Sequence, residues 1–468
     1  MGSARQAILA GACREAAMRE IDLLVRAGFL YPMTGDLPIL RDAEVAIAGD
    51  RIVHAGAAMP AGSWRARREI GGAATAVLPG FVNAHTHTAS LLFRGRTDDV
   101  AGGAALYDVA FRMEKTIGRE EWRDLSWAGA VEMLRSGFTT VNDLWYAPDL
   151  LAEACAASGL RAQIANKVFD VALERLALDD YTHLPAIGEQ RLREGVDFAE
   201  RWHGREGGRI QARLGPHASD TCSPALHRQL RAEANRLKVG LHIHTAQSRR
   251  EVAEIRRAQG RGPLEYLRDL GVLAHDVVVA HLSFATDADL DAVAATGTAY
   301  AHTPTIYPRR GWYPRFAEIV GRGIPTGFAT DWMQNDPFEM MRNAVNALRL
   351  AAGDAGAMSC REALWYATVG AARIMGLEED IGSLAPGKKA DLVVVDLDRP
   401  HLQPFYGDYA ALVFYARADD VLTSVIDGRI VMEERRVVTV DEAEVHRALC
   451  RHTSSWQQRL IELGALRQ

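Results

Sequence analysis

The chain has 468 residues, which is longer than an ordinary compact domain and suits one large domain with an accessory one. A net charge of −6 does not indicate the excess of positive charge that is typical of proteins that bind nucleic acid or an anionic membrane. Its five cysteines include no CxxC pair, no stretch is apolar enough to cross a bilayer, and the apolar run at residues 7–12 is too short for a signal peptide. We therefore expect a cytoplasmic protein that binds neither nucleic acid nor membrane.

Short alternating strands are predicted near both ends of the chain. They occupy residues 21–31 and 43–57, and the same texture returns at residues 390–398 and 421–438, with Gly and Asp at the turns. Strand groups from opposite ends of a chain can pair with one another. The pattern predicts a small β-sandwich domain built from residues 20–78 and 382–440, followed by an amphipathic C-terminal helix in residues 441–468.

The middle of the chain, residues 79–381, alternates apolar strand-like runs with helical segments, which is typical of βα units around a parallel sheet. One predicted helix follows Asp336, a candidate N-cap, with Pro337 at its first position. Eight such units predict an α/β fold of the TIM-type (β/α)8 barrel class. The predicted strands are residues 81–87, 139–145, 160–169, 209–218, 239–247, 277–284, 298–305 and 325–331.

Polar side chains recur at the carboxyl ends of these strands, although strands that line a packed barrel should be apolar. Barrel enzymes carry their catalytic groups at this end, and buried polar groups need partners. So many polar side chains at equivalent positions predict an active site at the carboxyl ends of the strands. They are His85, His87, Asn142, Asp143, Lys167, His217, His242, His244, His281, His302 and Asp331.

The HxH pair on the first barrel strand indicates a metal site. His85 and His87 are two residues apart, so both side chains point to the same face of the strand. Two imidazoles can hold one cation, and a carboxylate from another strand, Asp331, supplies compensating charge. One histidine of the pair His242 and His244, which also share a face, would complete the site. Such ligands suit zinc, iron, cobalt and manganese in varying degree.

A series of motifs runs along the chain, at residues 79–87, 137–144, 214–224, 240–247, 278–283, 328–342 and 382–396. In their sequence and order these motifs resemble the amidohydrolase superfamily over nearly the whole chain, in particular its branch of cytosine deaminases, S-adenosylhomocysteine deaminases and triazine hydrolases. The phenylurea and thiocarbamate (molinate) herbicide hydrolases are a further analogy.

This resemblance implies a metal-dependent hydrolase with one divalent ion per chain, zinc first among the candidates, and a homo-oligomer such as a dimer or tetramer. The implied metal ligands are His85, His87, His244 and Asp331. His281 would orient or deprotonate the attacking water together with Asp331, and His217 would contact the substrate. A catalytically dead scaffold is a distant alternative, because all ligand positions are filled.

Lys167 suggests an alternative, because some superfamily members bridge two metals with a carboxylated lysine. That lysine generally belongs to the fourth strand, whereas Lys167 lies on the third predicted strand. Pairing of Lys167 with a nearby carboxylate is the simpler interpretation. In this alternative, Lys167 and His281 would be further metal ligands. The sequence also does not exclude His242 as a ligand.

The position three residues after His244 departs from the deaminases, which usually carry a glutamate there. This chain has Gln247, and a carboxamide can donate and accept hydrogen bonds but cannot move a proton at neutral pH. The sequence thus favours cleavage of an amide, urea or (thio)carbamate bond by an activated water. Deamination or dechlorination of an N-heterocycle is the alternative.

Aromatic rings in the loops after the strands, such as Trp332, predict a pocket for a small, largely apolar molecule. We expect Gln247, His217, Trp332 and His302 to contact this substrate. Four loop arginines, Arg94, Arg96, Arg309 and Arg310, are more typical of surface charge than of an anion site.

Overall fold

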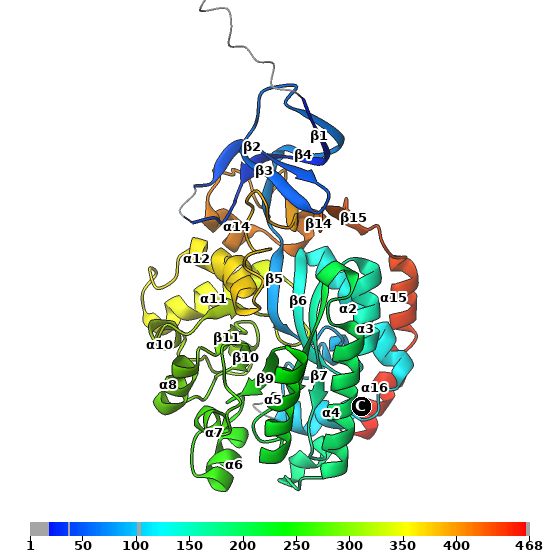
Figure 1. The fold of residues 1–468 in the computed structure, drawn as a ribbon, viewed down its shortest axis with the longest axis vertical. Helices are drawn as coiled ribbons and strands as arrows, with labels where there is room; N and C mark the ends of the chain where they lie inside the picture. Colours follow the sequence, from blue (N-terminus) through cyan, green and yellow to red (C-terminus); the bar gives the residue numbers. More distant parts are fainter. Residues whose placement is uncertain (1–17, 36–37, 101–103, 465–468) are drawn as a thin grey trace, which may run out of the picture.

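Two eight-stranded sheets organise the protein, as seen in a computed structural model that describes residues 18–35, 38–100 and 104–464. The smaller domain lies at one end of the elongated molecule, and the larger one, with its helices, forms the rest (Figure 1). The short apolar run at residues 7–12 lies outside the described residues. None of the helices described is both long and apolar enough to span a membrane.

The larger sheet is a parallel barrel in which each strand pairs with the next along the chain. A bridge between Thr86 and Asp331 brings the segment after the last strand beside the first, and the Asp331 amide donates to the His85 carbonyl at 3.0 Å. The predicted barrel is therefore confirmed. Its strands are β5 (Phe81–Thr86), β6 (Phe138–Trp145), β7 (Arg161–Val168), β8 (Ile210–Pro216), β9 (Leu241–Thr245), β10 (Val277–His281), β11 (Ala299–His302) and β12 (Thr326–Phe328).

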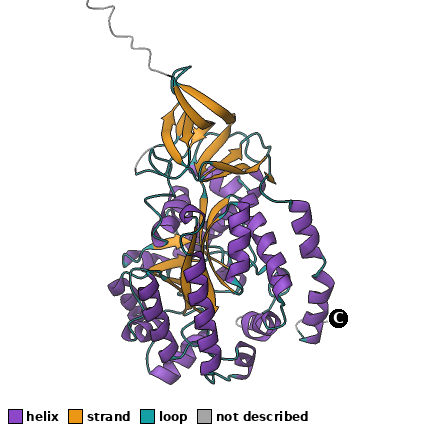
Figure 2. Cartoon of the chain, turned by 45° about the vertical axis from the view of Figure 1, so that its right-hand side comes forward, coloured by secondary structure: helices purple, strands orange, loops and turns teal. Residues whose placement is uncertain are grey.

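The helices cover the outside of the barrel (Figure 2). Helix α11 begins as predicted, because the Asp336 carboxylate accepts from the amides of Phe338 and Glu339. The α-helices are α1 (Phe111–Glu114), α2 (Arg119–Ser136), α3 (Pro148–Ser158), α4 (Pro185–Trp202), α5 (Pro224–Leu237), α6 (Arg249–Gln259), α7 (Pro263–Asp269), α8 (Asp287–Thr296), α9 (Ile306–Arg309), α10 (Phe316–Gly321), α11 (Pro337–Ala352), α12 (Cys360–Trp365), α13 (Ala371–Ile374), α14 (Tyr409–Tyr415), α15 (Glu442–Cys450) and α16 (Thr453–Glu462).

The small domain joins both ends of the chain in one curved sheet around a shared apolar core that includes Val25, Val45 and Leu392. Strand β4 holds the two parts together, since it pairs parallel with β1 and antiparallel with β13. A small β domain built from both chain ends is thus confirmed. In sheet order its strands are β16 (Arg436–Val437), β15 (Arg429–Glu433), β14 (Val421–Ile426), β13 (Leu392–Asp396), β4 (Trp64–Pro79), β1 (Arg19–Leu30), β2 (Leu40–Ala48) and β3 (Arg51–Ala57).

The C-terminal tail forms two helices, α15 and α16, where the sequence predicted one. His452, between them, lies 2.9 Å from Asp124 of α2, and the indole of Trp456 donates to Glu121 at 2.7 Å. These contacts bind the tail along the barrel wall. Helical periodicity alone did not reveal the break between the two helices.

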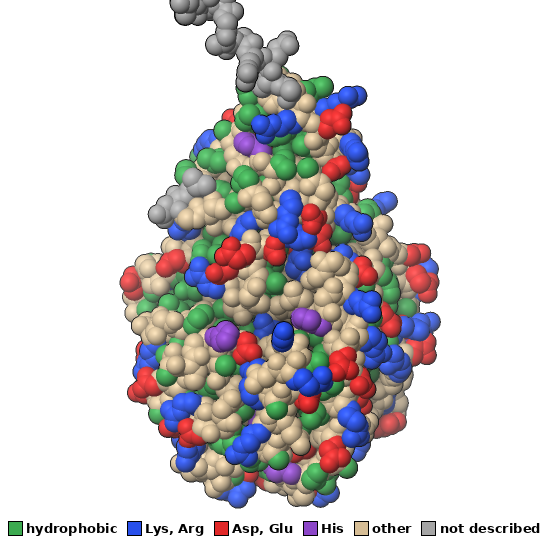
Figure 3. Space-filling model, viewed as in Figure 1, with side chains coloured by type: hydrophobic (Ala, Val, Ile, Leu, Met, Phe, Trp, Pro, Cys, Tyr) green, Lys and Arg blue, Asp and Glu red, His purple; other side chains and the backbone are tan. Residues whose placement is uncertain are grey.

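The surface seen in Figure 3 intersperses acidic and basic side chains and shows no extended basic area on that face. This distribution agrees with the net charge of −6.

Candidate metal centre and its pocket

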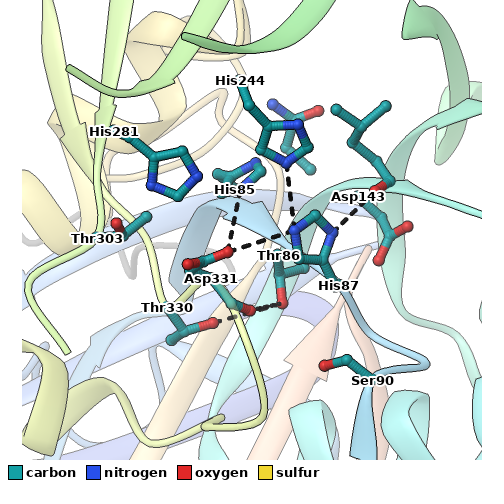
Figure 4. A network of polar contacts seen from close by, with 12 residues as sticks. His85, Thr86, His87, Ser90, Asp143, His244, His281, Thr303, Thr330 and Asp331 are labelled. Atoms are coloured by element: carbon teal, nitrogen blue, oxygen red, sulfur yellow. Dashed lines mark hydrogen bonds and ion pairs between the residues drawn. The ribbon is translucent and has the colours of Figure 1, made fainter. Parts of the chain in front are cut away.

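Strands from opposite sides of the barrel bring four histidines and one aspartate together at the carboxyl ends of the strands (Figure 4). An Asp331 carboxylate oxygen lies 3.4 Å from His85 Nε2 and 3.3 Å from His87 Nε2. The donor atoms of His85, His87 and Asp331 lie within 4.8 Å of one another, as do those of His85, His244 and His281. The convergence expected of these five residues is present.

Contacts at the far side of three of these rings aim their Nε2 atoms at the centre. His85 Nδ1 lies 2.7 Å from His242 Nε2, and His87 Nδ1 lies 2.8 Å from the Leu144 carbonyl oxygen. His244 Nδ1 lies 2.5 Å from the His217 carbonyl oxygen. Such partners fix ring orientation at metal sites. His242, left open by the sequence, therefore lies behind His85 and not among the converging donors.

The electrostatics of the centre fit a divalent cation. Burial lowers the pKa of His85, His87 and His244, so these rings are neutral at pH 7 and offer lone pairs. Burial alone would raise the pKa of Asp331, but His281 and hydrogen bonds from His85 and His87 hold it well below its usual range. The Nε2 atoms of His87 and His244 face each other at 3.3 Å. Neutral imidazoles with one carboxylate are a donor set that suits zinc.

Two residues of the centre have unusual backbone. His281 and Asp331 adopt positive φ angles of 80° and 63°, a region that residues other than glycine rarely occupy. Strain of this kind is often found at functional sites. Here it occurs at the point where strand β10 ends and where the segment after β12 closes the barrel.

A small pocket opens directly onto the centre. Gln247, His217 and Trp332, which the sequence predicted to contact the substrate, are among the residues that line it. Its lining is His87, Ala105, Leu106, Trp145, Lys167, His217, His244, Gln247, Ser248, His281, Ser283, Ile306, Tyr307, Arg310, Trp312, Asp331 and Trp332.

His302 does not join this lining, contrary to the expected substrate contact. Its Nδ1 lies 2.8 Å from the Tyr300 hydroxyl and its Nε2 lies 2.8 Å from the Tyr313 hydroxyl, and its ring packs against Phe316 and Phe328. The side chain is fully buried. His302 therefore occupies a hydrogen-bonded place in the packing between the barrel and helix α10.

Lys167 pairs with a carboxylate, in line with the simpler interpretation. Its ammonium lies 2.8 Å from Glu114, which also accepts from the Tyr146 hydroxyl at 2.8 Å. The ammonium lies over the rings of Trp145, Tyr146 and Phe111 at 4.6–5.0 Å. The amine of Lys167 is thus engaged by Glu114.

The loop after β9, which carries Gln247, is fixed by a carboxylate that the sequence did not single out. The amides of Ala246 and Gln247 donate to the buried Glu251 at 3.0 and 2.8 Å, and Ser219 donates at 2.5 Å. Burial raises the pKa of Glu251 to about 7. No motif marks Glu251, because its position on α6 makes it look like an ordinary helix residue.

Asp220 is a second buried carboxyl in this region, and neither of its oxygens has a hydrogen-bond partner among the described residues. Burial, with Glu251 nearby, raises its pKa well above the usual value. In the unfolded chain its pKa is about 3.9. The folded state therefore loses stability as pH rises above that value, until the folded pKa is passed.

We expect Asp220→Asn to raise the melting temperature because it removes this cost, and the gain should be larger at pH 8 than at pH 5. Calorimetry at both values measures it. Asp419→Asn, a change at an exposed site, is the matched control. An equal gain in melting temperature at both pH values would contradict a raised pKa of Asp220 in the folded protein.

Comparison with known proteins agrees with the fold and the centre. The amidohydrolase family profile matches residues 76–431. A 5-methylthioadenosine/S-adenosylhomocysteine deaminase of Symbiobacterium thermophilum is 35% identical over 424 residues, covering 88% of this chain and 94% of that protein.

Solved structures of other proteins share the fold of this chain. An adenosine deaminase from Xanthomonas campestris, crystallised with bound zinc, is 26% identical, covers 95% of this chain and 100% of its own, and superposes with a TM-score of 0.85. The atrazine chlorohydrolase of Arthrobacter aurescens, also with zinc, is 23% identical with a TM-score of 0.81, covering 93% and 99% of the two chains, and this likeness shows the fold alone. The chain belongs to the amidohydrolase family and is a metal-dependent hydrolase.

Proposed function

We propose that the protein is an aminohydrolase that removes an amino group from a planar N-heterocycle by attack of an activated water. The observation that carries this is the direct opening of the His and Asp centre into a pocket walled by Trp145, Trp312 and Trp332. Indole side chains pack well against an aromatic ring, and a few polar groups can fix the orientation of that ring. The names of the deaminase relatives support the same reaction class.

The proposed ligands of the metal are His85, His87, His244 and Asp331, whose donor atoms converge. A divalent ion held there would lower the pKa of a water molecule and polarise the bond under attack. His281 belongs to the same cluster, and burial lowers its pKa to about 4, so its ring is neutral at pH 7 and could accept a proton from that water. Asp331 would share this proton transfer.

Gln247 lines the pocket and presents a carboxamide to the ring. It can donate a hydrogen bond to a ring nitrogen or accept one from an amino group. His217 lines the same wall, and burial keeps its pKa well below the usual value, so it too offers a neutral ring.

A second candidate is hydrolysis of an amide, urea or (thio)carbamate, and Gln247 is the observation that favours it. That reaction needs no proton delivered to a ring nitrogen, because the leaving nitrogen takes its proton late. His281 and Asp331 would serve both transfers.

The test is a panel assay of the zinc-loaded protein with amino-heterocycles on one side and amides, ureas and carbamates of similar size on the other. Ammonia released from an amino-heterocycle would support the aminohydrolase. Cleavage of only the acyl compounds would establish the second candidate, and no turnover of either set would overturn both. Elemental analysis of the same sample is expected to give one metal ion per chain.

A further inference from the structure

Resting on the proposed function, we infer that Arg310 binds an anionic group of the substrate, so that the preferred substrates are planar N-heterocycles that carry a carboxylate. Of the four loop arginines considered from the sequence, only Arg310 lines the pocket.

The other loop arginines that have carboxylate partners are engaged at the surface. Arg94 bonds to Glu132 at 2.5 Å, and Arg309 lies 3.1 Å from Asp98. Both of these arginines border an outer, open depression away from the metal centre. Their charges are thus compensated within the chain.

The guanidinium of Arg310 is held in place from one side. Its Nη1 donates to the carbonyl oxygens of Thr97 at 2.6 Å and Val100 at 3.3 Å. Carbonyl oxygens fix the group but do not cancel its charge. Within the described part of the chain, no carboxylate forms an ion pair with Arg310, and neither Nε nor Nη2 has a hydrogen-bond partner.

Arg310 therefore lines the pocket while its Nε and Nη2 donors have no hydrogen-bond partner among the described residues. Burial lowers the pKa of Arg310, but an arginine remains protonated at neutral pH. Two carboxylates, Asp331 and Asp98, act on its charge, and both have other partners: Asp331 is committed to the metal in the proposed site, and Asp98 pairs with Arg309. A cation left without a counter-charge in a half-buried site is stabilised by an anionic ligand.

Three further donors in the same lining lack partners. Trp145 Nε1, Trp312 Nε1 and Ser283 Oγ are buried atoms with no hydrogen-bond partner among the described residues. Buried donors of this kind are normally satisfied, so each calls for an acceptor supplied by a ligand. Together with Arg310 they make the lining rich in donors, which matches the oxygens of an anion.

A carboxylate fits this arrangement better than a phosphate. One guanidinium fork matches the two oxygens of a carboxylate in plane. Phosphate sites usually add several backbone amides or further basic groups, whereas Lys167, the other cation of the lining, is already neutralised by Glu114.

The test compares binding of nicotinate and nicotinamide, two planar N-heterocycles of equal size that differ in charge, by calorimetric titration of the zinc-loaded protein. We expect nicotinate to bind more tightly, and Arg310→Gln to weaken it about 10- to 100-fold while nicotinamide changes less than about twofold. Arg309→Gln, which removes the neighbouring surface arginine, is the matched control and should change neither ligand.

Arg310→Lys should retain part of the preference for nicotinate, because it keeps the charge and loses the fork. Unchanged nicotinate affinity in Arg310→Gln would overturn the inference, since the metal alone would then account for anion binding. An equal loss of both ligands would also overturn it, because Arg310 would be supporting the pocket wall. Since binding is measured without turnover, failure here is distinct from failure of the proposed reaction in the panel assay.

Discussion

Asp331→Asn is expected to lower kcat by at least about 10³-fold and to release most of the metal. The carboxylate lies 3.4 and 3.3 Å from the Nε2 atoms of His85 and His87, and it supplies the negative charge at the proposed ligands. An amide of the same shape keeps the side-chain volume but removes that charge and the capacity to move a proton. Steady-state kinetics on a substrate identified in the panel, with elemental analysis of the purified variant, measure both effects.

Asp336→Asn is the matched control, because Asp336 caps helix α11 five residues further along the chain and is not among the converging donors. Asparagine caps helices about as well as aspartate, so metal content and kcat should stay near the original values. Full activity in Asp331→Asn would rule out the proposed centre. Full metal content with lost activity would confine Asp331 to proton transfer.

Gln247→Glu is expected to increase ammonia release from an amino-heterocycle by about 10²-fold. A carboxyl group at this place can carry a proton to a ring nitrogen, which the carboxamide cannot. The loop backbone should keep its position, because Glu251 holds the Ala246 and Gln247 amides irrespective of the side chain at 247. Initial rates of ammonia release as a function of pH measure the gain.

Gln457→Glu, the same substitution on the exposed face of α16, controls for the change in net charge. A gain in deamination with unchanged or reduced acyl hydrolysis would support the aminohydrolase. If deamination stays absent while amides or ureas are cleaved at the original rate, the aminohydrolase reading fails and the second candidate stands.

Much of the architecture could be predicted from the sequence because strand and helix patterns are local. The alternation of apolar runs identified all eight barrel strands, and the HxH spacing placed His85 and His87 on one face before any contact was known. Since parallel strands end at one rim, distant residues such as His281 and Asp331 were expected together.

The sequence was less informative where position depends on packing between elements. His302 ends a barrel strand in the same register as the other histidines, yet its ring is enclosed by Tyr300, Tyr313 and Phe316. A strand alternates its side chains between two faces, and the pattern alone did not tell which face His302 takes. Arg310 is the opposite case, because the sequence favoured a surface position and the structure places it in the pocket lining. Only the fold of its loop distinguishes it from Arg309, which pairs with Asp98 at the surface.

The bridge between Thr86 and Asp331 implies that the metal site is completed only late in the synthesis of the chain. His85 and His87 belong to the first barrel strand, whereas Asp331 follows the eighth, so the proposed ligands sit on both sides of the seam where the barrel closes. During translation the early histidines leave the ribosome long before their carboxylate partner exists. The complete cation site can form only once the last strand has docked. An ion bound there would then link the first and last parts of the barrel and stabilise its closure.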